Sequence, residues 1–464
     1  MRVDAILYAR AQMGLSLAFH IVFAAAGVAL PLLMVIADAL WMRTRHPAYR
    51  ELSERLAKGT GVLFAVGAVS GTVLSFELGL LWPMFMERFG ALIGLPFALE
   101  GFAFFTEAIF LGIYLYGRGR VSERFHLFAG IMVAVSGAAS AFFVTLVNAF
   151  MNGPAETVAR MMGAGVDSIA PVAAMWSPSW RTQTVHVLLA SYEATAFAMA
   201  GIHAALLLRD PRRELHRKAL AIALAVAAVA ALAQPLSGDR SAKHIAVAQP
   251  LKLAAAEAHF QTTGAAPLHL GGWPDLDRHR VSGALEIPGG LSFLAFGDTT
   301  APVRGLLEFP RDEWPPVARV HLAFQVMVGA GSTLAALAVL AAALAIRRRR
   351  LPDGRKFLLA VVVASPLGFV ALEAGWLVTE WGRQPWVVRG LMRTAEAVGP
   401  ATHGGWPFWT FSLIYLFLGA AVAYLLVKQI GAAHRAVPTL ATSSGDVGRR
   451  SGAPALKDGG HAPV

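Results

Sequence analysis

Four side chains that can bind iron stand within long apolar stretches of the sequence. They are two histidines, a methionine and a glutamate: His20, His186, Met327 and Glu373. An ionisable group inside a membrane costs several kcal/mol, so the histidines and the glutamate are functional candidates by default. Imidazole is a common ligand of haem iron, and a thioether opposite it raises the reduction potential.

The pairing of these ligands predicts two kinds of iron site. His186 with Met327 gives a six-coordinate, low-spin iron suited to single-electron transfer. His20 or Glu373 alone on an iron leaves one position open, as a dioxygen site requires. Each residue also has a plainer interpretation, because histidines hydrogen-bond between helices and methionines fill gaps in a core. His321 is the main rival of Met327 as a ligand, since it lies nearer the surface on the same predicted helix.

The chain has no cysteine, which limits the metal chemistry. Disulfides, thiolate-ligated haem, Cys-ligated iron-sulfur clusters and haem attached through a Cys pair are excluded. Any metal must therefore be held by His, Met or carboxylate. His126 and His203 stand toward the inner ends of their predicted helices, so we expect them to make structural contacts.

Two further acids share one face of a predicted helix. Glu100 and Glu107 are seven residues apart, which is two helical turns, so they project from the same side. Such a pair can relay protons, because a carboxyl group in an apolar surrounding can hold and release one. On spacing alone, two neutral acids that hydrogen-bond between helices are an equal alternative.

Two polar clusters lie outside the apolar stretches. Arg383, Gln384 and Trp386 follow the eighth stretch, where Arg can grip haem propionates and Trp can anchor the interface, or all three can form an ordinary interfacial belt. Lys252 and Glu257 lie in LKLAAAEAHF, which reads as a short amphipathic helix. A cation and a carboxylate there can bind a quinol head group and accept its protons; the alternative is a solvated charged face.

Nine apolar stretches must position these residues. The chain has 464 residues, 56% apolar and 15% charged, which is the profile of a polytopic membrane protein. A bilayer core of about 30 Å needs roughly 20 apolar residues per helix. The sequence predicts an all-α integral membrane protein with spans at residues 14 to 40, 59 to 83, 92 to 116, 127 to 150, 184 to 208, 218 to 236, 318 to 346, 357 to 381 and 407 to 431.

The distribution of Lys and Arg predicts the orientation. They cluster after the first, third, fifth and seventh stretches and in the C-terminal tail. The positive-inside rule places these segments in the cytoplasm, with the N-terminus outside and the C-terminus inside. The net charge of +11 is then mainly a topology signal, and we expect no nucleic-acid partner. In this orientation nearly all the candidate residues lie in the outer half of the bilayer.

The domain organisation follows from the same pattern. Residues 1–236 carry six spans, 237–317 form an extracytoplasmic loop, 318–432 carry three more spans, and 433–464 form a disordered cytoplasmic tail. A connection as long as 237–317 is usually functional, and it contains Lys252 and Glu257.

Six ordered segments resemble the large subunit of cytochrome bd quinol oxidases. They are HIVF from His20, LEGFAFFTEAIF from Leu99, TVHVLLASY from Thr184, QPLKLAAAEA from Gln249, FQVMVGAG from Phe324 and EAGWLVTEWGRQPW from Glu373. The resemblance covers the whole membrane portion. It implies a haem-bearing subunit, in the bacterial cytoplasmic (inner) membrane, that oxidises quinol outside and reduces dioxygen to water. The proton gradient then comes from charge separation without pumping.

The resemblance implies roles for the four iron-binding candidates. His186 and Met327 match the axial ligands of low-spin haem b558. His20 and Glu373 match the ligands of two high-spin haems, b595 and d, without deciding which residue serves which haem. In some members a second high-spin haem b stands in place of haem d, so the third haem stays open.

The resemblance also implies roles for polar residues and partners. Glu100 and Glu107 match acids on the proton route, and Lys252 and Glu257 match the quinol-binding loop. The implied partners are a second polytopic subunit, ubiquinol or menaquinol, dioxygen and the bilayer, with a small single-helix subunit left open.

Two features depart from the usual family pattern. Gln325 stands where the family usually carries Arg, which removes a positive charge near the b558 propionates. The loop is also short, as in the branch that includes cyanide-insensitive oxidases. The alternatives are a cytochrome b that passes electrons to another partner and a proton-coupled transporter, although the chain lacks the internal repeats of many transporters.

Overall fold

The computed structural model describes residues 2–153, 171–398 and 405–435, and nine spans in these ranges are long and apolar enough to cross a membrane. The predicted all-α class and its nine spans are confirmed. They are α1 (Arg2–Thr44), α2 (Pro47–Leu81), α3 (Pro83–Gly117), α4 (Glu123–Asn152), α7 (Trp180–Arg209), α8 (Glu214–Ala248), α11 (Val317–Arg348), α12 (Arg355–Ala364) with α13 (Leu367–Trp381), and α15 (Trp406–Arg435). Apart from the end of α15, the predicted tail 433–464 lies outside the described residues.

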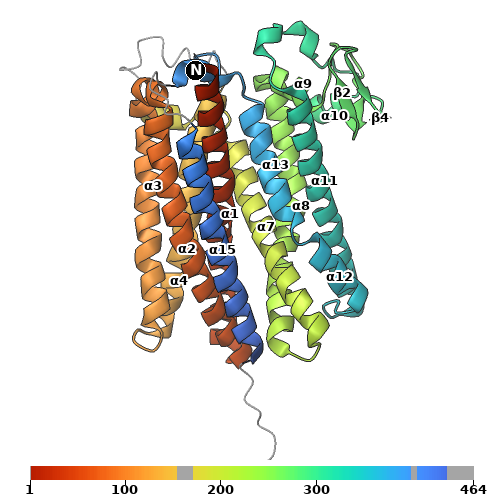
Figure 1. Cartoon of the computed structure of the whole chain (residues 1–464). Helices are drawn as coiled ribbons and strands as arrows, with labels where there is room; N and C mark the ends of the chain where they lie inside the picture. Colours follow the sequence, from red (N-terminus) through yellow and green to blue (C-terminus); the bar gives the residue numbers. More distant parts are fainter. Residues whose placement is uncertain (1, 154–170, 399–404, 436–464) are drawn as a thin grey trace, which may run out of the picture.

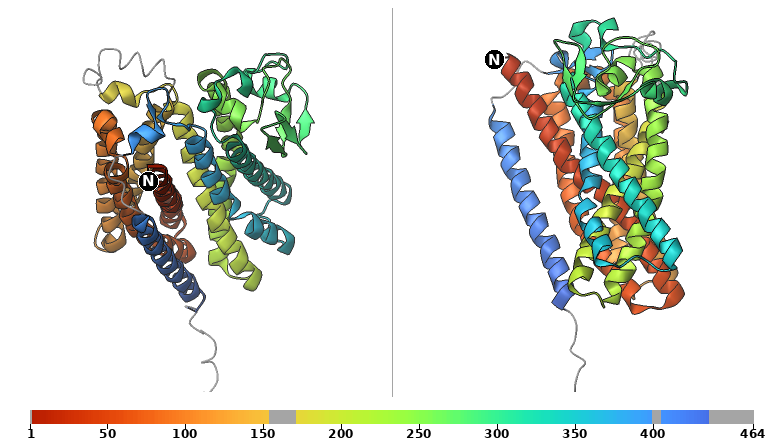
Figure 2. Two further views of the ribbon diagram at one scale, coloured as in Figure 1. Left: turned by 45° about the horizontal axis from the view of Figure 1, so that its top comes forward. Right: turned by 90° about the vertical axis from the view of Figure 1, so that its right-hand side faces the viewer.

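The spans form two rings of four helices (Figures 1 and 2). In the first ring α1 packs on α2, α2 on α3, α3 on α4, and α4 on α1. In the second ring α7 packs on α8, α8 on α11, α11 on α13, and α13 on α7. Both α1 and α4 contact α7, which joins the rings, and α15 lies along α1 and α2. Each ring therefore turns the inner faces of four helices toward a common interior.

The largest apolar core fills one end of this bundle. The N-terminus of α1 and the segment around α9 lie at the other end, which we call the loop end (Figure 1). The core draws on the second halves of α1 and α7 and the first half of α8, where Leu33, Phe197 and Leu220 are fully buried. Dense packing of this kind leaves little free space. The polar candidates of the rings therefore stand mostly on the loop side of a closed apolar core.

The sixth span is longer than its apolar stretch. α8 continues to Ala248, twelve residues beyond the predicted end at 236, so the loop begins at Gln249. Asp239, Arg240 and Lys243 end the apolar run without ending the helix. Hydropathy marks the part of a helix that lies in the bilayer, whereas helix length is set by backbone hydrogen bonding.

The eighth span is broken into α12 and α13. The break falls at Ser365 and Pro366, and Pro366 has no N–H to continue the helical hydrogen bonds. The chain comes unusually close to α7 just beyond it, because a Cβ placed on Gly368 would lie 2.5 Å from Cα of Ala194. The break and this close approach aim α13 along α7.

Residues 249–316 form a small domain on the loop end. It contains α9 (Pro250–Ala256), α10 (Gly290–Phe296), two single 3-10 turns (Leu306–Glu308 and Arg311–Glu313) and two antiparallel hairpins. β1 (Leu268–Leu270) pairs with β4 (Leu285–Ile287), and β2 (Trp273–Asp275) pairs with β3 (Arg280–Ser282). After α13, β5 (Trp386–Val388) pairs with β6 (Met392–Arg393), ahead of the short helix α14 (Thr394–Ala397). The remaining short helix is α6 (Pro171–Met175).

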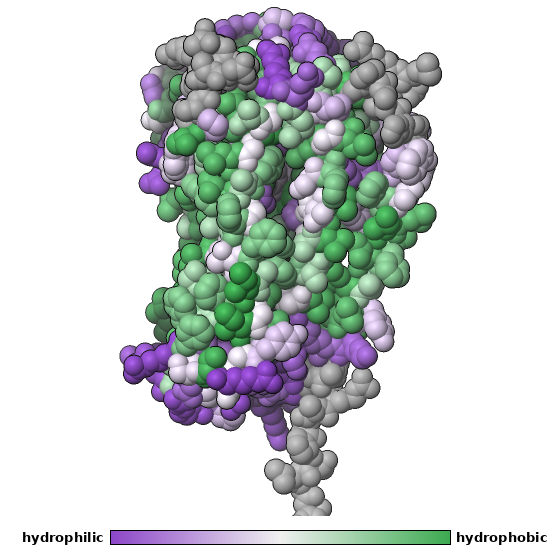
Figure 3. Space-filling view, turned by 90° about the vertical axis from the view of Figure 1, so that its left-hand side faces the viewer, coloured by the Kyte–Doolittle hydropathy of each residue, from purple (hydrophilic) through white to green (hydrophobic). Residues whose placement is uncertain are grey.

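The outer surface of the helices suits a lipid environment. The face in Figure 3 shows a broad apolar belt between two polar rims. Large apolar side chains point outward on several helices, with Phe76, Phe102 and Phe417 more than 70% exposed. Helices satisfy their own backbone hydrogen bonds, which is the requirement for spanning a bilayer.

Candidate metal centres and quinol site

His186 and Met327 stand on opposite helices of the second ring. His186 lies six residues into α7 and Met327 ten residues into α11, about 9 and 15 Å along helices that both begin at the loop end. α7 and α11 face each other across the ring, since each packs on α8 and on α13. Both side chains are half-buried. The fold thus brings an imidazole and a thioether into one ring from two sides, as a pair of axial ligands requires.

Three of the four candidate iron ligands lie against glycines of a neighbouring helix. The distances from a Cβ placed on the glycine to the ligand side chain are 3.0 Å for Gly71 and His20, 3.1 Å for Gly375 and Met327, and 3.7 Å for Gly238 and His186. At the two shorter distances a larger residue would push the ligand aside. These glycines could not be recognised from the sequence, because their role depends on which helices meet.

His20 is held through one ring nitrogen. Its Nδ1 lies 2.9 Å from the hydroxyl oxygen of Ser70 on α2. Because the second ring nitrogen, Nε2, is not used in this contact, the ring can present it to a metal. At His186 the amide nitrogen of Gln234 lies 3.2 Å from Nε2 and 3.4 Å from Nδ1. The Gln234 amide can donate a hydrogen bond to one of these ring nitrogens, which leaves the other ring nitrogen without this partner.

Glu373 carries a buried oxygen with no partner. It stands eight residues before the end of α13, about 12 Å from the loop end. Its Oε1 atom is buried and has no hydrogen bond. Ile21 and Leu372, the sequence neighbours of His20 and Glu373, pack in one apolar cluster. α1 and α13 therefore meet at the level of both candidate ligands.

Glu100 and Glu107 lie deeper than the other candidates. Glu100 stands at the middle of α3, and Glu107 lies in the half away from the loop end. A Cβ placed on Gly137 of α4 would lie 3.4 Å from Oε2 of Glu107 and equally far from the carbonyl oxygen of Gly27 on α1. The Glu107 carboxyl group is thus buried inside the first ring, among three helices.

The helix that carries Lys252 is buried on all sides. The prediction of an amphipathic helix with an exposed charged face is therefore wrong. Residues 251 to 256 of α9 are all buried, and Lys252 and Glu257 are only 5% and 3% exposed. A solvated charged face is thereby excluded. α9 packs against α8 and α11, and its small alanine side chains allow these helices to approach closely.

Burial changes the acid-base properties of this pair. It raises the pKa of the Glu257 carboxyl to about 8. Burial, with the nearby Arg383 guanidinium, lowers the pKa of Lys252 to about 7. Both groups therefore change charge near neutral pH, which suits proton transfer to and from a bound substrate.

A chain of amides connects Lys252 to Arg383. The Lys252 ammonium donates to Oδ1 of Asn152 at 3.0 Å and to the Thr379 carbonyl at 3.3 Å. The Asn152 amide donates to Oδ1 of Asn148 at 3.0 Å, which also accepts from Arg383 at 3.3 Å. Neither asparagine was predicted from the sequence. Their spacing of four residues at the end of an apolar stretch was a signal that could have shown them.

The cluster after α13 is more enclosed than an interfacial belt. Arg383 is 5% exposed and pairs with Glu380 at 2.5 Å, while its Nε atom is buried without a partner. Gln384 accepts a hydrogen bond from Thr394 at 2.9 Å. Trp386 is half-buried in β5, beneath the guanidinium of Arg393. Arg383 therefore keeps one N–H for a further acceptor.

Gln325 and His321 hold the loop domain against α11. The amide nitrogen of Gln325 donates to the carbonyl of His269 at 2.9 Å, and its oxygen accepts from the N–H of Gly271 at 3.0 Å. His321 is 1% exposed, and its Nδ1 donates to the carbonyl of Ala256 at 2.8 Å. His321 is thus engaged with the loop domain, whereas Met327 lies deeper in the ring.

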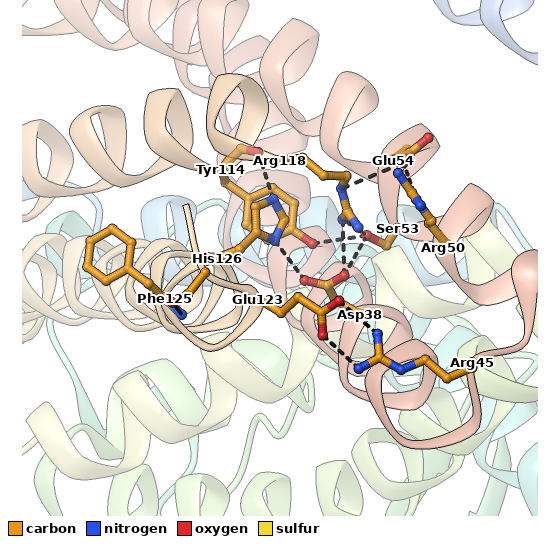
Figure 4. Close-up of polar contacts among 11 residues, drawn as sticks. Asp38, Arg45, Arg50, Ser53, Glu54, Tyr114, Arg118, Glu123, Phe125 and His126 are labelled. Atoms are coloured by element: carbon orange, nitrogen blue, oxygen red, sulfur yellow. Dashed lines mark hydrogen bonds and ion pairs between the residues drawn. The ribbon is translucent and has the colours of Figure 1, made fainter. Parts of the chain in front are cut away.

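His126 belongs to a buried polar cluster at the end opposite the loop (Figure 4). Its Nδ1 lies 2.9 Å from Oδ2 of Asp38, and its Nε2 lies 3.0 Å from the carbonyl of Tyr114. Arg118 donates to Asp38 at 3.0 Å and to Ser53 at 2.6 Å. Both ring nitrogens of His126 face acceptors, so neither is free for a metal, in line with the structural contact expected. His203 likewise contacts another side chain: its Nδ1 atom lies 3.1 Å from Nδ1 of His216.

A second buried acid, Glu77, was missed. It is 2% exposed on α2, and its Oε1 accepts hydrogen bonds from Gln12 at 2.6 Å and Ser16 at 2.8 Å. Tyr415 of α15 donates to Ser16 at 2.9 Å. The criterion that selected Glu100, an acid within an apolar stretch, applies equally to Glu77.

The donor set fits haem better than a metal bound by protein alone. Among the described residues no group of three or more His, Cys, Asp or Glu is placed to hold a metal ion. Haem supplies four ligands itself and needs only one or two from the protein. The free nitrogen of His20, the unpartnered oxygen of Glu373 and the opposed His186 and Met327 meet that need. The fold and these sites define a membrane-embedded haem protein.

Comparison with known proteins identifies the family. The family model "Cytochrome bd terminal oxidase subunit I" matches residues 8–434, so the chain belongs to this family. The solved bd oxidase of Geobacillus thermodenitrificans is similar, with a TM-score of 0.86 and 40% identity over 92% of this chain and 99% of that one. A Bacillus subtilis protein named "Putative cytochrome bd menaquinol oxidase subunit I" is 37% identical over 92% of this chain and 96% of its own length. The cytochrome bd-II ubiquinol oxidase subunit 1 of Escherichia coli is 27% identical over 92% and 96%.

The family membership answers the question of function class. The protein is the haem-bearing subunit of a quinol oxidase, a multi-pass protein of the bacterial inner membrane that catalyses oxidation of quinol by dioxygen. It contains haem and acts with a second subunit. The cytochrome b and transporter alternatives are thereby disfavoured.

Proposed function

We propose that His186 and Met327 hold the iron of low-spin haem b558, and that His20 and Glu373 each hold a high-spin haem. The observation that carries this proposal is the placement of His186 and Met327 on opposite helices of one ring. Met327 lies six residues deeper along α11 than its rival His321 and rests against Gly375 of α13, which favours Met327 as the second ligand. Haem bound there would supply one-electron transfer between quinol and dioxygen, and these four side chains would hold its iron. The high-spin haems are b595 with either d or a second b.

The outer groups have supporting roles. The unpartnered Nε of Arg383 supports binding of a haem propionate by this residue. Gln384 and Trp386 lie next to Arg383 in the chain and complete the proposed propionate site. Lys252 and Glu257 bind the quinol head group, and Glu257 in its ionised form takes a proton from the quinol hydroxyl. The burial of both residues supports this role in quinol binding, because hydrogen bonds to the substrate are stronger where water is excluded.

Glu107 and Glu100 carry protons toward the site of water formation. Glu107 is buried within the first ring and nearer the end opposite the loop, while Glu100 lies two turns closer to the loop end. Protons are thus taken from the side opposite to that on which quinol releases them. Because protons are taken up on one side of the membrane and released on the other, the reaction generates a proton gradient and requires no pump.

The orientation has the loop end and N-terminus outside and the C-terminus in the cytoplasm. The chain has no native cysteine, so a single introduced cysteine reports which side it faces. Arg278→Cys in the loop domain should react with an impermeant maleimide in intact cells. Arg348→Cys at the other end of α11 should react only after lysis. The reverse pattern would invert the proposed direction of proton release.

The substrate is ubiquinol or menaquinol, and a small single-helix subunit can accompany the second subunit. The alignment with the Escherichia coli relative extends over 493 positions, more than the 464 residues of this chain, so that relative carries residues that this chain lacks. The decisive experiment for haem content is a reduced-minus-oxidised spectrum with pyridine haemochrome analysis of the purified complex. Three haems, one of them low-spin, are expected; a complex without low-spin haem would overturn the assignment of His186 and Met327.

A further inference from the structure

The hydroxyl group of Ser70 faces two kinds of partner at once. Its oxygen lies 2.9 Å from the carbonyl of Val66 and 3.2 Å from that of Gly67, both in the preceding turn of α2. The same oxygen lies 2.9 Å from Nδ1 of His20 on α1. Ser70 is fully buried, so water does not compete for these contacts.

The contacts of Ser70 favour one tautomer of His20. A carbonyl oxygen only accepts hydrogen bonds, so the contacts with Val66 and Gly67 are hydrogen bonds only when the single hydroxyl proton of Ser70 points to one of them. The oxygen lone pairs then accept from His20, which requires the proton of a neutral imidazole to sit on Nδ1. Nε2 is left with an unshared electron pair. That is the form of histidine that binds a metal.

Gly71 supports the same arrangement from the next position of α2. A Cβ placed on Gly71 would lie 3.0 Å from Cε1 of His20. The imidazole edge therefore rests directly on the α2 backbone while Ser70 holds its Nδ1–H. Two consecutive residues of α2 thus orient the ring, and the contact with Ser70 favours a proton on Nδ1.

We propose that Ser70 is a positioning residue that sets the tautomer and basicity of His20 as an iron ligand, an inference that rests on the assignment of His20 above. A hydrogen bond from Nδ1–H to an acceptor makes the opposite nitrogen a stronger donor and favours the oxidised iron. Removing the acceptor should raise the midpoint potential of the haem bound to His20. It should also weaken haem retention at that site by about 10- to 100-fold, as for other outer partners of metal-bound histidine.

The test compares two substitutions of equal shape in the whole oxidase complex. Ser70→Thr keeps a hydroxyl, while Ser70→Val replaces it by a methyl group. Ser75→Ala is the matched control, because Ser75 bonds only to the Gly71 carbonyl at 3.1 Å and is exposed on the same helix. The readouts are haem content, midpoint potential by redox titration, and the iron–histidine stretching frequency in resonance Raman spectra.

Ser70→Val should raise the potential, lower the stretching frequency and lower the haem content, while Ser70→Thr and Ser75→Ala should match the unmodified protein. Equal behaviour of the Val and Thr variants would overturn the inference. His20→Ala separates this failure from that of the proposed function. If His20→Ala leaves all high-spin haem in place, His20 is no ligand and the assignment itself fails. If it removes a high-spin haem while Ser70→Val changes nothing, only the role of Ser70 is wrong.

Discussion

The side-chain amide of Gln325 in α11 donates a hydrogen bond to the backbone carbonyl of His269 in β1 at 2.9 Å. Gly271 returns a hydrogen bond from its N–H to the same amide. Gln325 stands two residues before Met327, so one turn of α11 both holds the loop domain and carries a candidate haem ligand. Gln325 therefore has a structural role of its own, in holding the loop domain.

Gln325→Ala should weaken the docking of the loop domain. Two lost hydrogen bonds correspond to about 1–3 kcal/mol. We expect the KM for quinol to rise several-fold with little change in the potential of the low-spin haem. Thr333→Ala is the control, since its exposed hydroxyl bonds only within α11. An unchanged KM would show that the loop domain is held by other contacts.

Gln325→Arg tests the electrostatic side of the same position. A guanidinium there adds a positive charge near the proposed propionates, so the low-spin haem should become easier to reduce. Redox titration of that haem should show a higher midpoint potential. An unchanged potential would mean that the departure from the family pattern does not act on this haem.

The axial ligands can be tested against their rival. His186→Ala and Met327→Ala should each abolish the low-spin spectrum and leave the high-spin features, because each removes one of two axial ligands. His321→Ala should keep the low-spin spectrum and instead loosen the contact with Ala256. Loss of the low-spin signal in the His321 variant alone would exchange the roles of the two residues.

The pKa of Glu257, raised to about 8 by burial, predicts a pH dependence. Below that pH the carboxyl is protonated and cannot take a proton from quinol, so kcat at saturating quinol should rise as the pH passes through about 8. Glu257→Gln should remove this rise and slow quinol oxidation by about 10²- to 10⁴-fold, the usual range for a general base. Oxygen consumption with an artificial reductant should change much less. Equal losses in both assays would place Glu257 elsewhere in the mechanism.

Lys252 predicts a separate pH dependence, in the KM for quinol. With its pKa lowered to about 7, the ammonium is lost as the pH rises, so quinol binding should weaken and the KM should rise as the pH passes through about 7. Asn152→Asp places a carboxylate beside the ammonium, which should raise the pKa of Lys252 and move this rise in KM to higher pH. Asn152→Leu removes the partner and should move it to lower pH. If neither substitution moves the rise in KM, another group is responsible for it.

The sequence predicted the spans well because a bilayer demands long apolar helices. It also selected His20, His186 and Glu373, because an isolated polar group in such a helix is conspicuous. It did not predict that α8 runs to Ala248, since polar residues leave the membrane without ending a helix. Nor did it predict the burial of α9, because seven residues carry too short a pattern to show which faces are covered.

The parts of the site that escaped prediction are those made between helices. Ser70 and Asn152 are ordinary residues in sequence, and their importance lies in reaching His20 and Lys252 from another helix. Gly71 and Gly375 likewise matter only because a ligand side chain rests on them. Such contacts depend on helix rotation and register, which periodicity in a uniformly apolar helix does not fix.

The buried cluster around Asp38 predicts a large effect on stability. Asp38 is 1% exposed and His126 4%, and four helices contribute to the cluster (Figure 4). His126→Ala removes one of two partners of the Asp38 carboxylate and leaves its ion pair with Arg118, so the free energy of unfolding should fall by about 1–3 kcal/mol. Lys243→Ala breaks an exposed ion pair with Asp239 and should cost less than about 1 kcal/mol.

Unfolding of the purified complex in detergent, followed by helical circular dichroism, would compare the two variants. The haem spectrum of the His126 variant should stay intact before unfolding, because both ring nitrogens of His126 are used within the cluster. Loss of a haem with unchanged stability would instead make His126 part of a metal site. A drop in stability with all haems retained would place the Asp38 cluster among the contacts that fasten the helices at the end opposite the quinol loop.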